Sequence, residues 1–299
     1  MGFGSIDRAG RKRDHASRVA MTGDRKIENM VTRVAIVGAS GRLGTVVRDV
    51  VEALDDFEVS ALLTSRSDIS EIDGADIVVD VTSPAVSIDI VRAALERGIT
   101  VLVGTSGWSQ ERIAQLRPLV AESGAGVIFI PNFSLGSVIG SALSAAAAPF
   151  FAFAEIVEAH HDAKVDSPSG TAVRTAELIA AARAEVGPVE APHADQRARG
   201  QRVASVPVHS LRRPGVIAKQ EVILSGPGES LTIVHDTVEA ALAYAPGIRI
   251  ALEAARTATG VTVGLDSFLN IGIGAPQPLV DVTIVEDAAS GQVARATGL

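Results

Sequence analysis

The stretch Val34-Ala-Ile-Val-Gly-Ala-Ser-Gly-Arg-Leu-Gly44 decides the fold that this chain is expected to adopt. An apolar run, Val34–Val37, leads into three glycines spaced G-x-x-G-x-x-G, a variant of G-x-G-x-x-G, and helical spacing of apolar residues follows. Strand, glycine turn and helix in this order are typical of a dinucleotide-binding site. Gly38 permits the tight turn, Gly41 lets the backbone approach a pyrophosphate, and Gly44 allows the helix to pack against the strand. A glycine turn that binds no ligand is the alternative.

Strands and helices alternate outward from this stretch as far as residue 130. Apolar runs predict strands, and apolar residues at helical spacing predict helices. The predicted strands are Val34–Val37, Val59–Leu63, Ile77–Val81, Val101–Val103 and Gly126–Ile130, and the predicted helices are Arg42–Leu54, Val86–Leu95 and Glu111–Ala121. This β-α-β alternation predicts a Rossmann-type parallel sheet with helices on both faces.

The pattern changes after Pro131-Asn132. Strand-like runs there alternate between apolar and polar residues, which indicates an open sheet with one face covered. The predicted elements are a small-residue helix at about 135–148, a strand Ala154–His160, a helix Thr171–Arg183, a loop Pro188–Gln201, strands Val206–Leu211, Val216–Leu224 and Ser230–Val234, and a helix at 247–258. The chain is therefore predicted to be α/β, with a second α+β domain after the Rossmann-type domain.

The composition bounds the class of protein. At 299 residues the chain suits two domains, and it is 47% hydrophobic but only 3% aromatic, so aliphatic residues must fill the core. The net charge of −8 argues against a broad nucleic-acid surface, although a local basic site for an anionic ligand is compatible with it. The absence of cysteine excludes disulfides, thiolate metal sites and a cysteine nucleophile, and it fits a reducing cytoplasm. No segment is long and apolar enough to predict a membrane span.

The first 30 residues differ from the rest. Residues 1–29 carry seven Lys or Arg against four Asp or Glu and contain no apolar run, so they lack the core of a signal peptide. They are interpreted as a disordered basic leader, or as an upstream start, because Met30 stands just before the first strand. A nucleic-acid-binding tail is the alternative.

The end of the second predicted strand bears on the choice of cofactor. An acidic residue usually stands there and binds the ribose 2′-hydroxyl of NAD. Here the strand ends Leu63-Thr-Ser-Arg66, without Asp or Glu, and Arg42 lies in the glycine turn. Both arginines suit a ribose 2′-phosphate, which favours NADPH over NADH as the cofactor. The alternative is that Arg66 is only solvated.

Two later turns are also expected to border the cofactor. Gly104-Thr-Ser-Gly107 and Pro131-Asn-Phe-Ser134 each follow a predicted strand. Ligands collect at the carboxyl ends of parallel strands, where both turns lie. The alternative, which fits each turn about as well when the turn is considered alone, is an ordinary loop that binds no ligand.

The stretch Glu158-Ala-His-His-Asp-Ala-Lys-Val-Asp-Ser-Pro-Ser-Gly-Thr-Ala172 carries the candidate reaction site. His160 and His161 end a predicted strand, so their side chains point to opposite faces, and one can face a cleft while the other packs elsewhere. Lys164 follows across a turn, where it suits a proton donor or a carboxylate-binding cation. The alternatives are one buried and one surface histidine, and a solvated lysine. A zinc site is disfavoured, because adjacent strand residues do not converge easily on one ion.

The turn Ser169-Gly-Thr171 opens the next predicted helix. Free backbone N–H groups and the positive end of the helix dipole bind a carboxylate at such a position. Ser169 also suits a plain N-cap, and the two roles are compatible. Proton donors and an anion site within fifteen residues are what the reduction of a small dicarboxylate requires.

These motifs together resemble those of the dihydrodipicolinate reductase (4-hydroxy-tetrahydrodipicolinate reductase) family. The pattern E-x-H-H-x-x-K-x-D-x-P-S-G-T-A is the most specific of them. The resemblance runs from about Arg33 to Gly274 and is strongest at 36–44, 104–107, 131–136 and 158–172. It implies a dinucleotide-binding domain over residues 31–131 and about 245–275, a substrate-binding and tetramerisation domain with an open mixed sheet over 132–244, and a tail over 276–299.

The resemblance also implies an activity. A nicotinamide cofactor, NADPH or NADH, reduces the ring of 4-hydroxy-tetrahydrodipicolinate, a dicarboxylate of lysine and diaminopimelate biosynthesis, in a cytoplasmic homotetramer without a metal. By the same resemblance His160 is a proton donor and acceptor and Lys164 a proton donor, while the substrate is bound by His161, Ser169, Gly170 and Thr171. Together with Arg66, the cofactor-binding residues are Gly38, Ala39, Ser40, Gly41, Arg42, Leu43, Gly104, Thr105, Ser106, Ile130, Pro131, Asn132 and Phe133.

The chain departs from the family pattern in places. Ala163 and Lys219 stand at or near positions where the family often carries histidine, and Glu239–Tyr244 lacks the usual arginine and is one residue longer. These departures bear on the outer substrate pocket rather than on His160 and Lys164. Two alternative functions therefore remain: a related dehydrogenase with an altered substrate, and a Rossmann protein that senses nucleotides without turnover.

Overall fold

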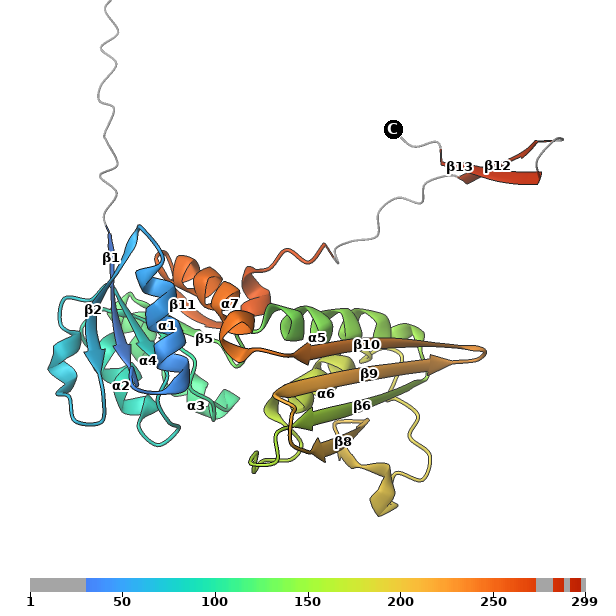
Figure 1. The fold of residues 1–299 in the computed structure, drawn as a ribbon, viewed down its shortest axis with the longest axis horizontal. Helices are drawn as coiled ribbons and strands as arrows, with labels where there is room; N and C mark the ends of the chain where they lie inside the picture. Colours follow the sequence, from blue (N-terminus) through green and yellow to red (C-terminus); the bar gives the residue numbers. More distant parts are fainter. Residues whose placement is uncertain (1–30, 273–281, 288–290, 297–299) are drawn as a thin grey trace, which may run out of the picture. The chain divides into compact units, whose positions relative to one another are not determined.

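The computed structural model describes residues 31–272 and the backbone of residues 282–287 and 291–296 (Figure 1). The predicted leader over residues 1–30 lies outside these ranges. In the predicted tail, β12 (Val282–Asp287) pairs antiparallel with β13 (Gly291–Ala296) as a two-stranded sheet, in a region to which the sequence assigns no element.

A six-stranded parallel sheet forms the Rossmann-type part of the chain. Its strand order is β11-β5-β4-β3-β1-β2. In that order the strands are Gly260–Val263, Gly126–Phe129, Thr100–Val103, Ile77–Asp80, Thr32–Val37 and Phe57–Leu63. The parallel sheet that the β-α-β alternation predicts is thereby confirmed.

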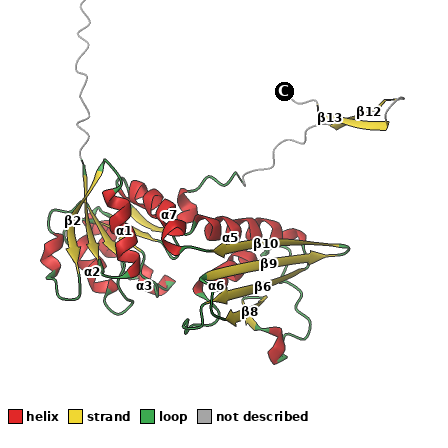
Figure 2. Ribbon diagram, in the orientation of Figure 1, coloured by secondary structure: helices red, strands yellow, loops and turns green. Residues whose placement is uncertain are grey.

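Helices cover both faces of this sheet (Figure 2). One face packs against α1 and α7, and the other packs against α2, α3 and α4. Because both faces are covered, strands such as β3 are continuous apolar runs rather than alternating ones. The helices are α1 (Arg42–Glu52), α2 (Ser87–Leu95), α3 (Gln110–Ala114), α4 (Arg117–Ser123) and α7 (Ala240–Ala255).

A five-stranded mixed sheet forms the second part, in the order β10-β9-β6-β8-β7. In that order the strands are Glu229–Thr237, Ala218–Gly226, Phe153–His160, Val206–Arg212 and Gln201–Val203. Helices α5 (Leu135–Ala147) and α6 (Gly170–Ala182) lie on one face of this sheet. The other face carries partly exposed apolar side chains, among them Phe153, Leu211 and Val234, so the prediction of an open sheet with one covered face is confirmed.

Short 3-10 helices complete the described elements. They are Ile69–Ile72, Ala148–Phe150, Arg197–Arg199 and Leu265–Phe268. None of the helices in the described part of the chain has the length and apolarity needed to cross a membrane.

The single helix predicted at 111–121 is wrong, because the structure has two helices there, α3 and α4. Pro118 lies in the first turn of α4. It has no N–H to donate to the carbonyl of Ala114, and its ring would clash with that carbonyl in a continuous helix. The first turn of a new helix accepts proline, because the N–H groups there have no intrahelical partner.

The helix predicted at 247–258 is wrong in its bounds, because α7 starts at Ala240, ends at Ala255 and contains Pro246. Proline leaves one carbonyl without a partner, that of Leu242, and this residue is 68% exposed, so water can solvate the carbonyl. The sequence also misses strands β7 and β11. Each is a short edge strand that lacks a continuous apolar run, since β7 reads Gln-Arg-Val and β11 reads Gly-Val-Thr-Val.

Helix α7 packs directly on the turn that follows β5. A Cβ atom added at Gly247 would lie 1.9 Å from the carbonyl oxygen of Phe133 and 3.0 Å from the Leu265 side chain. Only glycine fits at this contact, so α7 touches the Pro131–Ser134 turn backbone to backbone.

Gly247→Ala is expected to destabilise the fold, because the added methyl group meets backbone that cannot move aside. Overpacking of this kind costs about 1–3 kcal/mol or more. The matched control is Gly140→Ala in α5, where the nearest neighbour of the added Cβ is 3.8 Å away. Alanine stabilises a helix by about 1 kcal/mol relative to glycine. The thermal unfolding midpoint should therefore fall for Gly247→Ala only, and equal midpoints for the two variants would contradict the contact.

Candidate active site

The glycine turn lies where β1 ends and α1 begins. β1 pairs with β2 on one side and with β3 on the other, so the strand order reverses there and leaves a crevice for a ligand. Gly38 has a φ of +93°, and a Cβ atom there would lie 2.5 Å from the Val81 carbonyl oxygen. A Cβ atom at Gly44 would lie 2.2 Å from the Gly38 carbonyl oxygen. This bare backbone at a helix N-terminus fits the pyrophosphate of a dinucleotide.

The two arginines expected to select the cofactor are both exposed. Arg42 is the first residue of α1, at the N-terminal end that faces a bound phosphate. Arg66 lies in the turn after β2, where its backbone N–H donates to Thr64 Oγ1 at 3.3 Å. Both guanidinium groups are therefore accessible at the carboxyl edge of the first sheet.

A buried hydrogen-bond network joins the turns after β3 and β4. Asp80 is fully buried, and its carboxylate accepts the Thr82 hydroxyl at 2.6 Å, the Thr82 N–H at 3.1 Å and the Ser87 hydroxyl. The Ser87 oxygen accepts the Trp108 indole N–H at 3.0 Å. The Thr82 N–H also donates to Thr105 Oγ1 at 2.8 Å. The network fixes the turn after β4, and no sequence pattern points to Trp108 as part of it.

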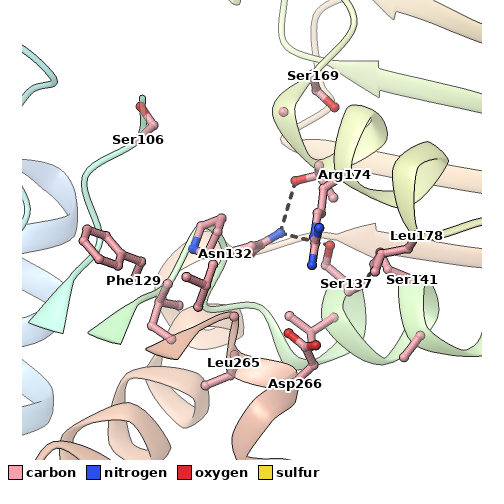
Figure 3. Close-up of a pocket in the computed structure, with 18 of the residues that line it drawn as sticks. Ser106, Phe129, Asn132, Ser137, Ser141, Ser169, Arg174, Leu178, Leu265 and Asp266 are labelled. Carbon is pink, nitrogen blue, oxygen red and sulfur yellow. Dashed lines mark hydrogen bonds between the residues drawn. The ribbon is translucent and has the colours of Figure 1, made fainter. Parts of the chain in front are cut away.

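A cleft of about 930 Å³ is lined by residues from both parts of the chain (Figure 3). The predicted cofactor-binding residues that line it are Thr105, Ser106, Ile130, Pro131 and Asn132. The predicted reaction-site residues that line it are His160, Lys164, Ser169, Gly170 and Thr171. The structure therefore brings together two groups that the sequence predicts separately.

Other predicted residues do not line this cleft. Residues 38–43 form the glycine turn described above, and Arg66 follows β2. Gly104 and Phe133 lie behind the cleft wall, where a Cβ atom at Gly104 would be 2.8 Å from the Phe133 ring. Phe133 is buried, so its contribution to a cofactor site is to support the turn.

His161 also lies outside the set of residues that line the cleft. Along β6, Ala154, Ile156 and Glu158 are buried towards the helices, so alternation places His160, the last residue of the strand, on that face. Substrate binding by His161 therefore stays a prediction that rests on the family resemblance. Within the described residues, no group of three or more His, Cys, Asp or Glu side chains is arranged to hold a metal ion.

Asn132 connects the two walls of the cleft. Its side-chain amide donates to Ser137 Oγ at 2.9 Å and to Thr171 Oγ1 at 3.2 Å (Figure 3). Its carbonyl oxygen accepts the Ser134 N–H at 2.9 Å. One side chain therefore ties the turn after β5 to the first turns of α5 and α6.

His160 is held in a defined orientation by Glu158, two residues earlier on the same face of β6. Its Nδ1 lies 2.6 Å from Glu158 Oε2. An ionised carboxylate only accepts hydrogen bonds, so Nδ1 carries the hydrogen of this bond. Nε2 is then the nitrogen that can exchange a proton with a ligand in the cleft.

Glu158 is fully buried and has further partners. Arg212 on β8 donates to both of its oxygens, from Nη2 at 2.9 Å and from Nη1 at 3.0 Å. The Ser169 N–H donates to Oε1 at 3.2 Å. Burial raises the pKa of the Glu158 carboxyl, but the hydrogen bonds from His160 and Arg212 outweigh it and lower the pKa to about 2. Glu158 is therefore ionised, and sequence analysis gave no sign of its partner Arg212.

Lys164 is oriented by Asp166. Its Nζ lies 2.7 Å from Asp166 Oδ1, and its backbone N–H closes a turn onto the His161 carbonyl at 3.1 Å. The hydrogen bond from Lys164 lowers the pKa of the Asp166 carboxyl below its ordinary value. Arg212 Nη2 also donates to the Asp166 carbonyl oxygen at 2.6 Å, so the loop that carries Lys164 is tied to the Glu158 network.

The N-terminus of α6 combines a cap with an open anion site. Ser169 is the N-cap, and its hydroxyl oxygen accepts the Ala172 N–H at 3.2 Å. Gly170 and Thr171 are the first two residues of α6 and line the cleft, and N–H groups at these positions have no intrahelical acceptor. The N-cap is therefore present, and it leaves the N–H groups of Gly170 and Thr171 available to an anion.

The two walls of the cleft differ in chemistry. One wall is made by strand-end turns next to a dinucleotide cradle, and the other presents a histidine, a lysine and free backbone N–H groups. This arrangement defines a two-domain, dinucleotide-dependent oxidoreductase. Residues 32–133 match the family description "Dihydrodipicolinate reductase, N-terminus", and residues 136–269 match "Dihydrodipicolinate reductase, C-terminus". The chain belongs to the dihydrodipicolinate reductase family.

Individual relatives agree with this family. The 4-hydroxy-tetrahydrodipicolinate reductase of Clavibacter sepedonicus is 54% identical over 265 residues, which cover 88% of this chain and 95% of that protein. The enzyme of the same name from Clavibacter michiganensis subsp. michiganensis is 56% identical over 243 residues, or 81% of this chain and 87% of that protein. Dipicolinate-bound dihydrodipicolinate reductase from Paenisporosarcina sp. TG-14 has a TM-score of 0.69 at 27% identity, over 80% of this chain and 100% of that structure.

The low pKa of Glu158 predicts a loss of stability in acid. A carboxyl whose pKa is lowered by folding contributes free energy that is present above its unfolded-state pKa and is lost as the pH falls through its folded-state pKa. For a change from 4.5 to about 2, this contribution is on the order of 3 kcal/mol. It should disappear progressively between about pH 5 and pH 2.

Urea unfolding at a series of pH values measures this contribution. Glu158→Gln should flatten the acid dependence of the free energy of unfolding, whereas Glu177→Gln, at an exposed position of α6, should keep the wild-type slope. Parallel curves for the wild type and Glu158→Gln would show that the buried carboxyl is not the group that titrates.

Proposed function

We propose that this chain catalyses the NAD(P)H-dependent reduction of 4-hydroxy-tetrahydrodipicolinate to tetrahydrodipicolinate, a step of lysine and diaminopimelate biosynthesis. One observation carries the proposal: a single cleft is lined by the strand-end turns of a dinucleotide-binding sheet and by His160, Lys164 and the N-terminus of α6. The 4-hydroxy-tetrahydrodipicolinate reductases of the two Clavibacter relatives support the same substrate.

The bound nicotinamide supplies a hydride to the substrate ring. Hydride and one proton enter the substrate while water leaves, so the protein has to deliver a proton to the ring or to the departing oxygen. His160 exchanges protons at Nε2, because Glu158 occupies Nδ1. Lys164 donates a proton from Nζ and takes its orientation from Asp166.

The substrate is held by its carboxylates. Gly170 and Thr171 offer backbone N–H groups at the positive end of the α6 dipole to one of them. Ser169 keeps this helix end in place through the Ala172 N–H and the Glu158 carboxylate. His161 is assigned to the substrate by the family resemblance.

NADPH is the cofactor that we favour over NADH. Arg66 follows the second strand, where an acidic residue would bind the ribose 2′-hydroxyl of NADH, and Arg42 is exposed at the start of α1. The backbone of residues 38–43 takes the pyrophosphate. The turns containing Gly104–Ser106 and Ile130–Phe133 border the nicotinamide half.

We place the enzyme in the cytoplasm as a homotetramer. The absence of cysteine fits a reducing compartment. The open face of the mixed sheet, with exposed apolar residues such as Phe153 and Val234, supports assembly through that face.

Arg66→Ala is expected to raise the KM for NADPH about tenfold, which corresponds to one lost charge-assisted hydrogen bond. The KM for NADH should change little, because NADH has no 2′-phosphate. Arg48→Ala, which removes an arginine of α1 paired with Asp49, serves as the control and should change neither value. A wild type that binds NADH more tightly than NADPH, or a variant that loses both cofactors equally, would refute the preference.

Lys164→Ala tests the proposed proton donor. Turnover with freshly formed 4-hydroxy-tetrahydrodipicolinate should fall roughly 10²-fold or more, as for the loss of a general acid, while NADPH binds with wild-type affinity. Arg117→Ala is the control, because Arg117 is an exposed cation of α4, outside the residues that line the cleft. Full turnover by Lys164→Ala would remove Lys164 from the mechanism, and an inactive wild type would favour a nucleotide sensor or another substrate.

A further inference from the structure

The cleft continues along α6 beyond the residues discussed so far. Gly170, Arg174 and Leu178 follow one another at intervals of four residues, so they lie on one face of the helix. All three line the cleft, as does Thr171. Arg174 therefore lies one helical turn along the same wall from the N–H groups that we assign to a carboxylate.

Within residues 31–272, Arg174 is the cation of the cleft wall that has no ion-pair partner. Lys164 is paired with Asp166 at 2.7 Å. Asp266 also lines the cleft, but it does not come within ion-pair distance of Arg174. Within residues 31–272 the Arg174 guanidinium makes neither a hydrogen bond nor an ion pair, and Figure 3 shows the side chain reaching into the cleft from α6.

A free guanidinium in this position fits a carboxylate. Its planar fork donates two parallel hydrogen bonds to the two oxygens of one carboxylate, which gives direction as well as charge. One helical turn rises about 5.4 Å, a length comparable with the separation of two carboxylates that flank the nitrogen of a six-membered ring. The wall of α6 therefore offers two anion sites spaced for a ring dicarboxylate.

We propose that Arg174 binds the second carboxylate of the substrate and so selects dicarboxylates over monocarboxylates. This inference rests on the proposed function, which makes the substrate a ring dicarboxylate. The N-terminus of α6 holds the first carboxylate, and Arg174 holds the second in a bidentate hydrogen-bonded pair. The ring is thereby fixed at two points, with one edge towards His160 and Lys164.

Competitive inhibition by two pyridine acids tests the proposal. Dipicolinate, pyridine-2,6-dicarboxylate, has both carboxylates, whereas picolinate, pyridine-2-carboxylate, has one. The wild type with bound NADPH should prefer dipicolinate. Arg174→Gln should lose about tenfold or more of its affinity for dipicolinate, and its affinity for picolinate and NADPH should stay within about twofold.

Two further variants sharpen the test. Arg174→Lys keeps the charge but not the fork, so it should recover part of the lost preference. Arg92→Gln, at an exposed position of α2, should leave all three affinities unchanged. Thermal unfolding midpoints equal to that of the wild type would show that the variants fold.

The outcomes separate this inference from the proposed function. If Arg174→Gln loses affinity for both acids equally, or for neither, Arg174 does not bind the second carboxylate. The reductase activity would still hold in that case, provided that the wild type turns over its substrate. A wild type that neither binds dipicolinate nor oxidises NADPH would overturn the proposed function and this inference with it.

Discussion

The buried carboxylate of Glu158 is the constraint on which the reaction side of the cleft depends. It accepts hydrogen bonds from His160, from both ends of the Arg212 guanidinium and from the Ser169 N–H. Two neighbouring strands and the start of α6 therefore meet at one ionised group. A buried charge is costly to desolvate, and only a full set of charge-assisted hydrogen bonds offsets that cost. Removing Arg212 would leave the buried carboxylate without its guanidinium partner, a loss that is strongly destabilising.

The cofactor side depends on close backbone contacts rather than on a buried charge. Gly38 lies against the Val81 carbonyl, and Gly247 lies against the Phe133 carbonyl. These contacts fix the turns at the carboxyl ends of the parallel strands. Asn132 then joins this side to α6 through Thr171. A hydride donor and the proton donors can face one ligand only because both sides are fixed and connected.

The sequence predicts the elements with strong periodic signals. The β-α-β alternation and the glycine turn predict the parallel sheet, and the alternating runs after residue 200 predict the open second sheet. The errors have different causes: Pro118 is a local break between α3 and α4 that apolar spacing alone does not register, whereas the proline within α7 and the short edge strand β11 depend on tertiary contacts. The spacing of apolar residues cannot show that α7 continues through Pro246. The helix tolerates this proline because the carbonyl that it leaves without a partner, that of Leu242, faces water.

The sequence predicts the part of the candidate site whose residues are close together in the chain, and it misses the residues that only the fold brings there. His160, Lys164 and Ser169–Thr171 lie in one short stretch, so their spacing in the chain already indicates an acid site and an anion site. Arg212 is 54 residues from Glu158, and only the pairing of β6 with β8 brings them together. Trp108 likewise joins the Asp80 network only through packing, and no local pattern distinguishes it from a surface residue. Strand alternation places His160 in the cleft, whereas His161 follows the end of β6 and lies outside the residues that line the cleft.

In the proposed reaction this cleft brings a hydride donor and a proton donor to one ring dicarboxylate. Transfer of deuterium tests it most directly: NADPH carrying deuterium at the transferring position of nicotinamide carbon 4 is incubated with the wild-type protein and freshly formed 4-hydroxy-tetrahydrodipicolinate, and the product is analysed by mass spectrometry. We expect tetrahydrodipicolinate that carries one deuterium, formed in step with the loss of NADPH absorbance. NADPH that stays reduced, or product without deuterium, would contradict it.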